Sequence, residues 1–214
     1  MSALALLWLF AFPAAPQASR PVDVVFIIDV SDSVIAGIFK RDRALVREAA
    51  AALAAAMQAG DSARLGTFGD EITIDPAPLK DGDAIRAAGD RLTGRLGGRS
   101  PIWDALVAAA GTLEGAAAPR GVIVLTDGRS TGNRIGFADA VDQLKRARIP
   151  VFVVSLDKSD RPIPDPGTRL EQLAAATGGT CLFVDRPALP AAITRSVSSL
   201  RALSATAQPR RNNY

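Results

Sequence analysis

The chain contains no histidine and a single cysteine among its 214 residues. Without an imidazole it cannot build a Ser-His-Asp triad or a Cys-His pair. One thiol cannot close a disulfide within the chain, and a tetrahedral zinc site or an iron–sulfur cluster needs more thiolate or imidazole ligands than are present. Any site chemistry must therefore use carboxylates, hydroxyls, Lys, Arg, backbone groups or a hard metal ion.

Aromatic residues and charge of one sign are also scarce. Aromatics make up 5% of the chain, which argues against a platform on which nucleic-acid bases stack. The 25 basic and 22 acidic residues are interspersed and form no long basic run, so we expect no nucleic-acid partner. With 48% hydrophobic and 22% charged residues, the composition is that of an ordinary globular domain. Its bias towards Arg indicates an Arg- and Ala-rich genome rather than a nucleic-acid surface.

The first twenty residues differ in composition from the rest of the chain. An apolar run over residues 3–12 precedes small and turn-forming residues over 13–18, a pattern typical of a secretory signal cleaved near Ala15 or Ala18. A mis-assigned start and an unusual N-terminal anchor are the alternatives, because no Lys or Arg precedes the run. We expect a signal segment at 1–20, one domain at 21–204, a flexible tail at 205–214, and a secreted or periplasmic protein with no membrane span after cleavage.

From residue 21 onward, β-branched runs alternate with segments whose apolar residues recur at helical spacing. Ser100 is the expected N-cap of the third helix, with Pro101 at its first helical position. A tight turn between the second and third strands predicts an antiparallel hairpin. The fold class that follows is α/β: a doubly wound, Rossmann-like, mostly parallel six-stranded sheet with one short antiparallel edge strand and helices on both faces. The predicted strands are 22–28, 63–68, 71–75, 121–125, 151–156 and 180–184, and the predicted helices are 34–57, 83–92, 101–113, 137–148, 168–176 and 189–203.

Oxygen-bearing side chains follow two of the predicted strands and precede one helix. Ligands of doubly wound folds bind at the carboxyl ends of the strands, where the strand order reverses. If the first and fourth strands flank that point, three loops converge there, and they carry Asp29, Ser31, Ser33, Ser100 and Asp127. Carboxylate and hydroxyl oxygens suit a small hard cation such as Mg²⁺, which keeps exchangeable waters and attracts a carboxylate from outside.

The pattern Asp29-x-Ser31-x-Ser33, followed by Ser100 and Asp127, resembles the metal-ion-dependent adhesion site (MIDAS) of the von Willebrand factor type A (VWA) domain family. The resemblance extends over residues 22–203, including a Gly-Gly loop before the third helix and a Gly-Gly turn before the last strand. It implies that the three serines bind Mg²⁺ directly, with Mn²⁺ and Ca²⁺ as alternatives. It also implies that the two aspartates act directly or through water, and that a partner protein supplies a carboxylate to the ion.

Two positions depart from the family pattern. Ser100 stands where the family usually has Thr, and Asp32 stands where it often has a small residue such as Gly. Asp32 adds a negative charge beside the ion. Arg99, Arg129 and Arg134 flank the same loops and are candidate partner-binding residues together with Asp32, because Arg forms bidentate contacts with carboxylates. The alternative is that these arginines are solvated loop residues.

The function predicted is a non-catalytic, metal-dependent protein-binding module that acts in adhesion or in assembly of exported proteins. One alternative is a metal-dependent hydrolase or phosphotransferase on a doubly wound fold, for which Asp32 is the candidate general base. The other is a VWA scaffold with an idle metal site, in which Ser31 and Ser33 merely cap the first helix. The sequence carries neither the GxxxxGKS nor the GxGxxG phosphate-binding pattern, which favours the binding module over the enzyme.

Overall fold

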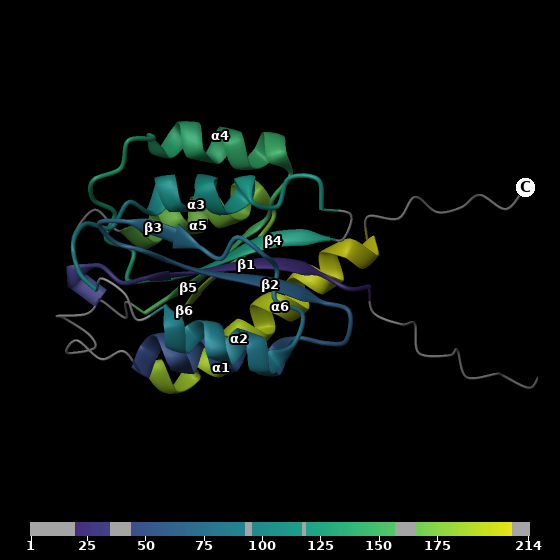
Figure 1. Ribbon diagram of the computed structural model, residues 1–214. Helices are drawn as coiled ribbons and strands as arrows, with labels where there is room; N and C mark the ends of the chain where they lie inside the picture. The colour runs from purple at the N-terminus through teal and green to yellow at the C-terminus, as the bar shows by residue number, and fades with distance from the viewer. Residues whose placement is uncertain (1–19, 35–43, 93–95, 117–118, 157–165, 207–214) are drawn as a thin grey trace, which may run out of the picture.

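A six-stranded sheet with the order β3-β2-β1-β4-β5-β6 forms the centre of the molecule. The computed structural model describes residues 20–34, 44–92, 96–116, 119–156 and 166–206 (Figure 1). Neighbouring strands are parallel except β2 and β3, which are antiparallel, as predicted for the hairpin. The strands are β1 (Asp23–Asp29), β2 (Ser62–Phe68), β3 (Ile72–Ile74), β4 (Arg120–Thr126), β5 (Val151–Ser155) and β6 (Cys181–Phe183).

Helices cover both faces of the sheet (Figure 1). β1 is buried on both faces, so its side chains pack alternately into two cores: Phe26 and Ile28 join one core, and Val25 and Ile27 join the other. The first core contains α1 (Ala44–Ala56), α2 (Gly82–Arg91) and α6 (Leu189–Thr206). The second contains α3 (Ile102–Gly111), α4 (Phe137–Ala147) and α5 (Pro166–Thr177). The predicted fold class is confirmed.

The strand order places the predicted site. β1 pairs with β4 directly, from Asp23 opposite Arg120 to Ile28 opposite Leu125, so both strands end at the same edge. The chain turns outward from β1 to β2 and β3 on one side, and from β4 to β5 and β6 on the other. The switch point of this sheet therefore lies between β1 and β4, and the loops after these strands lie side by side there.

Some expectations fall on parts of the chain that the structure does not describe. These are the predicted signal segment over residues 1–19, the early part of the first helix over 35–43, and the tail beyond 206. Among the described residues, no helix is both long enough and apolar enough to cross a membrane.

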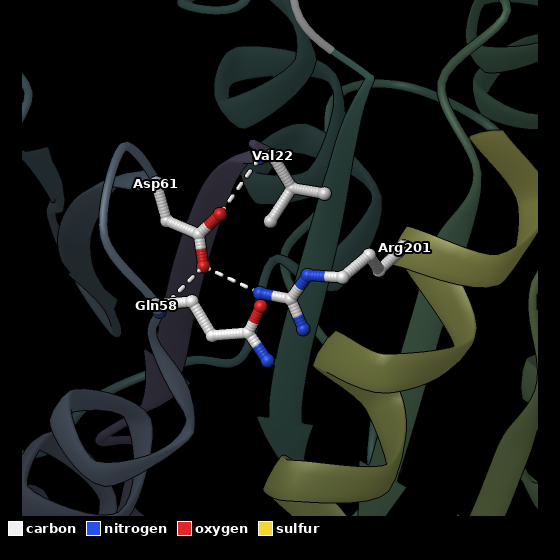
Figure 2. Close-up of polar contacts among 4 residues, drawn as sticks. All are labelled: Val22, Gln58, Asp61 and Arg201. Carbon is white, nitrogen blue, oxygen red and sulfur yellow. Dashed lines mark hydrogen bonds and ion pairs between the residues drawn. The ribbon is translucent and has the colours of Figure 1, made fainter. Parts of the chain in front are cut away.

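The last helix is tied to the first strand by a buried ion pair at the edge opposite the predicted site. Asp61, which precedes β2, pairs with Arg201 of α6 and accepts backbone hydrogen bonds from Val22 at 2.9 Å and Gln58 at 2.7 Å (Figure 2). The Asp61 side chain is 1% exposed and that of Arg201 12%. One carboxylate thus joins the start of β1, the turn after α1 and the end of α6, which are far apart in the sequence.

Candidate metal centre

Asp29 is the last residue of β1, and its buried carboxylate is the centre of the polar cluster. Its Oδ1 accepts a hydrogen bond from the backbone N–H of Ser31 at 3.0 Å. Its Oδ2 accepts hydrogen bonds from the hydroxyl of Ser100 at 2.8 Å and from the hydroxyl of Thr126 at 2.6 Å. Three separate loops or strand ends therefore meet on one carboxylate.

The partners of this carboxylate are all neutral. Burial raises the pKa of the Asp29 carboxyl to about 6, although the hydrogen bonds from Ser31 and Thr126 lower it and the nearby Asp127 raises it slightly. Burying a carboxylate without a cationic partner is unfavourable. A cation bound in this cluster would remove that cost, because it would place positive charge beside Asp29 and Asp127.

Ser31 and Ser33 project from the loop that leaves β1. Their hydroxyl oxygens lie 3.3 Å apart, so the alternating pattern does bring these two side chains together. Ser31 is buried with Asp29, whereas Ser33 is partly exposed and Asp32, between them, is exposed. The loop therefore presents two hydroxyls on one side and a carboxylate towards solvent.

Ser100 does not cap α3, contrary to the prediction. The helix begins at Ile102, Pro101 occupies the cap position, and no side chain there caps the helix. The hydroxyl of Ser100 donates to Asp29 instead, because the backbone on both sides is held by Thr131: Ser100 N–H donates to the Thr131 hydroxyl at 2.9 Å, and Thr131 N–H donates to the Ser100 carbonyl at 2.8 Å.

Asp127 follows the end of β4 and is 3% exposed. Its Oδ1 accepts the backbone N–H of Arg129 at 3.0 Å, which folds the start of the β4–α4 loop back over the strand end. Thr126, the residue before it, also accepts the N–H of Gly128 at 3.0 Å while donating to Asp29. Sequence reasoning missed Thr126; the signal that it belongs to the site is its position as the last residue of the strand beside β1.

The β4–α4 loop also completes the first turn of α3. Asn133 accepts the N–H of Trp103 at 2.8 Å, so this side chain satisfies an amide that Ser100 was expected to cap. The carboxylate of Asp104 in turn accepts the N–H groups of Arg134 and Ile135. Neither Thr131 nor Asn133 was predicted, since the pattern around them is that of an ordinary polar loop.

Glycines allow the loop before α3 to approach its neighbours closely. Gly97 and Gly98 have φ of +118° and +90°, a region that L side chains rarely adopt. A Cβ on Gly97 would lie 2.7 Å from Oδ1 of Asp32, and a Cβ on Gly98 would collide with the carboxyl of Asp70. The Gly97–Gly98 turn therefore has a carboxylate against each of its glycines.

The three arginines predicted as partner-binding residues are all exposed, but they lie differently. The side chain of Arg99 lies along Gly132 in the β4–α4 loop, where a Cβ would come within 2.6 Å of its Cδ. Arg129 lies two residues after Asp127 in the sequence, and its backbone N–H donates to the Asp127 carboxylate. Arg134 lines a separate surface groove beside α4, of about 260 Å³, together with Asp139, Asp142 and Arg146.

The oxygen atoms of the cluster can be compared, in type and spacing, with the ligands of an octahedral Mg²⁺ ion. In the described part of the chain, no three His, Cys, Asp or Glu side chains form a group that could hold a metal ion, so a site here depends on serine hydroxyls. Adjacent ligands on an octahedral Mg²⁺ ion lie about 3 Å apart. The Ser31 and Ser33 hydroxyl oxygens are 3.3 Å apart, and the Ser100 hydroxyl oxygen lies 2.8 Å from Oδ2 of Asp29. These spacings and the oxygen-only chemistry fit such an ion.

A family comparison covers most of the chain. The profile of the von Willebrand factor type A domain family matches residues 23–189, and the chain belongs to this family. No curated protein sequence matches it.

Solved structures share the fold at low sequence identity. A von Willebrand factor type A protein from Catenulispora acidiphila is 21% identical, with a TM-score of 0.66 over 86% of this chain and 43% of that one. The vWF domain of the type V pili tip protein Mfa5 from Porphyromonas gingivalis is 12% identical, with a TM-score of 0.70 over 90% and 98%. The pilus adhesin SpaC from Lactobacillus rhamnosus GG, in its open conformation, is 15% identical, with a TM-score of 0.66 over 86% and 30%.

Proposed function

We propose that this VWA domain is a non-catalytic protein-binding module that uses a divalent cation, with Mg²⁺ as the first candidate. The observation that carries the proposal is the convergence of Ser31, Ser100 and Thr126 on the buried carboxylate of Asp29. Ser31, Ser33 and Ser100 would bind the ion through their hydroxyls. Asp29 and Asp127 would bind it directly or through water.

The charge of this ligand set supports a role in recruiting an acidic partner. Where Asp29 and Asp127 act through water, only neutral hydroxyls bind the divalent ion directly, so positive charge remains at its open positions, which Mg²⁺ fills with exchangeable waters. A bound ion would supply a Lewis-acidic position at which an outside oxygen replaces water. The carboxylate of an Asp or Glu side chain from another protein is the ligand of matching charge and hardness.

Adhesion or assembly of exported proteins is the setting that we propose. Two of the structural neighbours are described as a pilus adhesin and a pilus tip protein, which supports this setting without assigning a partner. The composition of residues 1–20, with its apolar run, supports export to the periplasm or beyond.

Calorimetric titration with MgCl₂ and MnCl₂ tests the metal hypothesis. We expect saturable binding by the wild-type protein and no measurable binding by Asp127→Ala, because this substitution removes one of the two carboxylates that balance the ion. Asp142→Ala is the matched control, since it deletes an exposed carboxylate on α4 instead. Wild-type protein that binds neither ion at millimolar concentration would rule out the metal-dependent function and leave the idle scaffold.

A further inference from the structure

The candidate metal centre is bordered on the β2 side by two exposed carboxylates, Asp32 and Asp70, which we call the acidic flank. Both lie against the Gly97–Gly98 turn, and Asp70 also accepts the backbone N–H of Arg99 at 3.2 Å. The carbonyl oxygen of Gly97 would lie 2.6 Å from a Cβ on Gly69, which follows β2 directly. These contacts fix the acidic flank above the end of β2.

The opposite border carries positive charge. Arg99 extends away from the acidic flank, because its side chain lies along Gly132, with Nε 3.1 Å from the position of a Cβ there. Arg129 belongs to the same β4–α4 loop, two residues after Asp127. We call Arg99 and Arg129 the arginine flank. Both side chains are exposed, and within the described residues neither guanidinium forms an ion pair.

The order of the strands places the two flanks on opposite sides of the oxygen cluster. Because the order is β2-β1-β4, the charge along the strand ends runs from the acidic flank, across the oxygen cluster of Asp29, to the arginine flank. A carboxylate bound at the cluster would lie between them. A second acidic group of the same ligand would be attracted to one side and repelled from the other.

The inference that we draw from this charge distribution rests on the proposed function and specifies the chemistry of the partner. We propose that Arg99 and Arg129 bind a second carboxylate of the partner segment whose first carboxylate reaches the metal, and that Asp32 and Asp70 exclude acidic groups from the β2 side. In an extended segment, side chains two residues apart lie on one face about 7 Å apart. The ligand is therefore an extended protein segment with Asp or Glu at two positions that are two residues apart. The first carboxylate binds the metal and the second binds the arginine flank. The segment has no acidic residue beyond the first position, where it would meet the acidic flank.

Peptide titrations followed by ¹H–¹⁵N NMR test this inference on the Mg²⁺-loaded chain. The probes are acetyl-Gly-Asp-Gly-Gln-Gly-amide, with one carboxylate, and acetyl-Gly-Asp-Gly-Glu-Gly-amide, with two. Exposed ion pairs are individually weak, so we expect the second peptide to bind about fivefold more tightly. High salt should remove most of that advantage, because screening weakens exposed charge pairs.

Three variants locate the effect. The double variant Arg99→Gln/Arg129→Gln should bind both peptides equally, whereas the control Arg146→Gln on α4 should keep the advantage. A third probe, acetyl-Glu-Gly-Asp-Gly-Glu-Gly-amide, should bind wild type no better than the two-carboxylate peptide. It should gain affinity in Asp70→Asn, which keeps an oxygen to accept the Arg99 N–H.

The outcomes separate the inference from the proposed function. If the one-carboxylate peptide shows no Mg²⁺-dependent binding, the proposed function fails and the inference fails with it. If that peptide binds but the two-carboxylate peptide has no advantage, or keeps it in the double arginine variant, only the inference is overturned.

Discussion

At the scale of single residues, Thr126 shows how the site is built into the end of a strand. Its hydroxyl donates to Asp29 Oδ2 and accepts the N–H of Gly128, so one oxygen connects β4, β1 and the β4–α4 loop. The residue is fully buried. Any loss of this hydroxyl leaves two buried polar groups without one of their partners.

Replacing Thr126 by Val tests that role, because the side chain keeps its shape and loses only the hydroxyl. We expect the free energy of unfolding in metal-free buffer to fall by about 1–3 kcal/mol. Thr73→Val, at an exposed position on β3, is the matched control and should change stability little. Urea denaturation measures both, and equal losses in the two variants would contradict the assigned role.

At the scale of elements, the N-terminus of α3 depends on a loop that is distant in the sequence. Asn133 accepts the N–H of Trp103, and the Asn133 amide group donates to the Ser130 hydroxyl at 2.7 Å. Trp103 is 5% exposed and packs edge-to-face on Phe137 of α4 at 5.2 Å between ring centres. The loop that carries Asp127 is thus held by the helix that follows Ser100.

Asn133→Ala should remove the cap of α3 and destabilise the protein by about 1 kcal/mol. Asn133→Asp keeps an acceptor for Trp103 N–H and places negative charge at a helix N-terminus, so it should restore most of the stability. Thermal unfolding of the three proteins distinguishes them. An Ala variant as stable as wild type would show that the cap contributes nothing.

The cap of α3 also shows where the sequence was misleading. Ser100-Pro101 has the composition of a helix start, and local propensity alone assigns the Ser hydroxyl to the helix. The hydroxyl is used by Asp29 and the cap is supplied by Asn133, because the β4–α4 loop packs on this segment. Such a choice depends on tertiary contacts, which the local pattern does not contain.

At the scale of the whole molecule, the fold was predictable from the sequence, but the residues that hold the site residues in place were not. Buried strands such as β1 carry a strong β-branched signal, and alternation with amphipathic helices limits the topology to a doubly wound sheet. Asp29, Ser31 and Ser33 were predicted because they share one loop. Thr126 was missed because its role appears only when β4 lies beside β1. Thr131 was missed because its contact with Ser100 joins two loops that are distant in the sequence.

The ion pair between Asp61 and Arg201 links the ends of the domain, and its removal should affect the whole fold. Asp61→Ala leaves a largely buried guanidinium and the N–H groups of Val22 and Gln58 without this partner. We expect a loss of about 3–5 kcal/mol in the free energy of unfolding. Arg201→Met, which leaves the two backbone hydrogen bonds of Asp61 in place, should cost less, about 2 kcal/mol.

The matched control for this pair is the exposed ion pair between Arg47 and Asp90, whose side chains are 59% and 63% exposed. Arg47→Ala should change the free energy of unfolding by about 0.5 kcal/mol or less. Urea denaturation gives all three values. Similar small losses in the buried and exposed pairs would show that the Asp61–Arg201 pair does not hold α6 to β1.

We propose that a divalent cation binds among Asp29, Ser31, Ser33, Ser100 and Asp127. Paramagnetic Mn²⁺ tests it most directly, because it broadens the NMR signals of nearby amides. Adding substoichiometric MnCl₂ to ¹⁵N-labelled protein should remove the amide signals of Ser31, Ser100 and Gly128, leave that of Leu200 in α6 intact, and be reversed by excess Mg²⁺. Amide signals at Ser31 and Gly128 that survive Mn²⁺, or broadening centred on another part of the molecule, would show that no cation binds at this cluster.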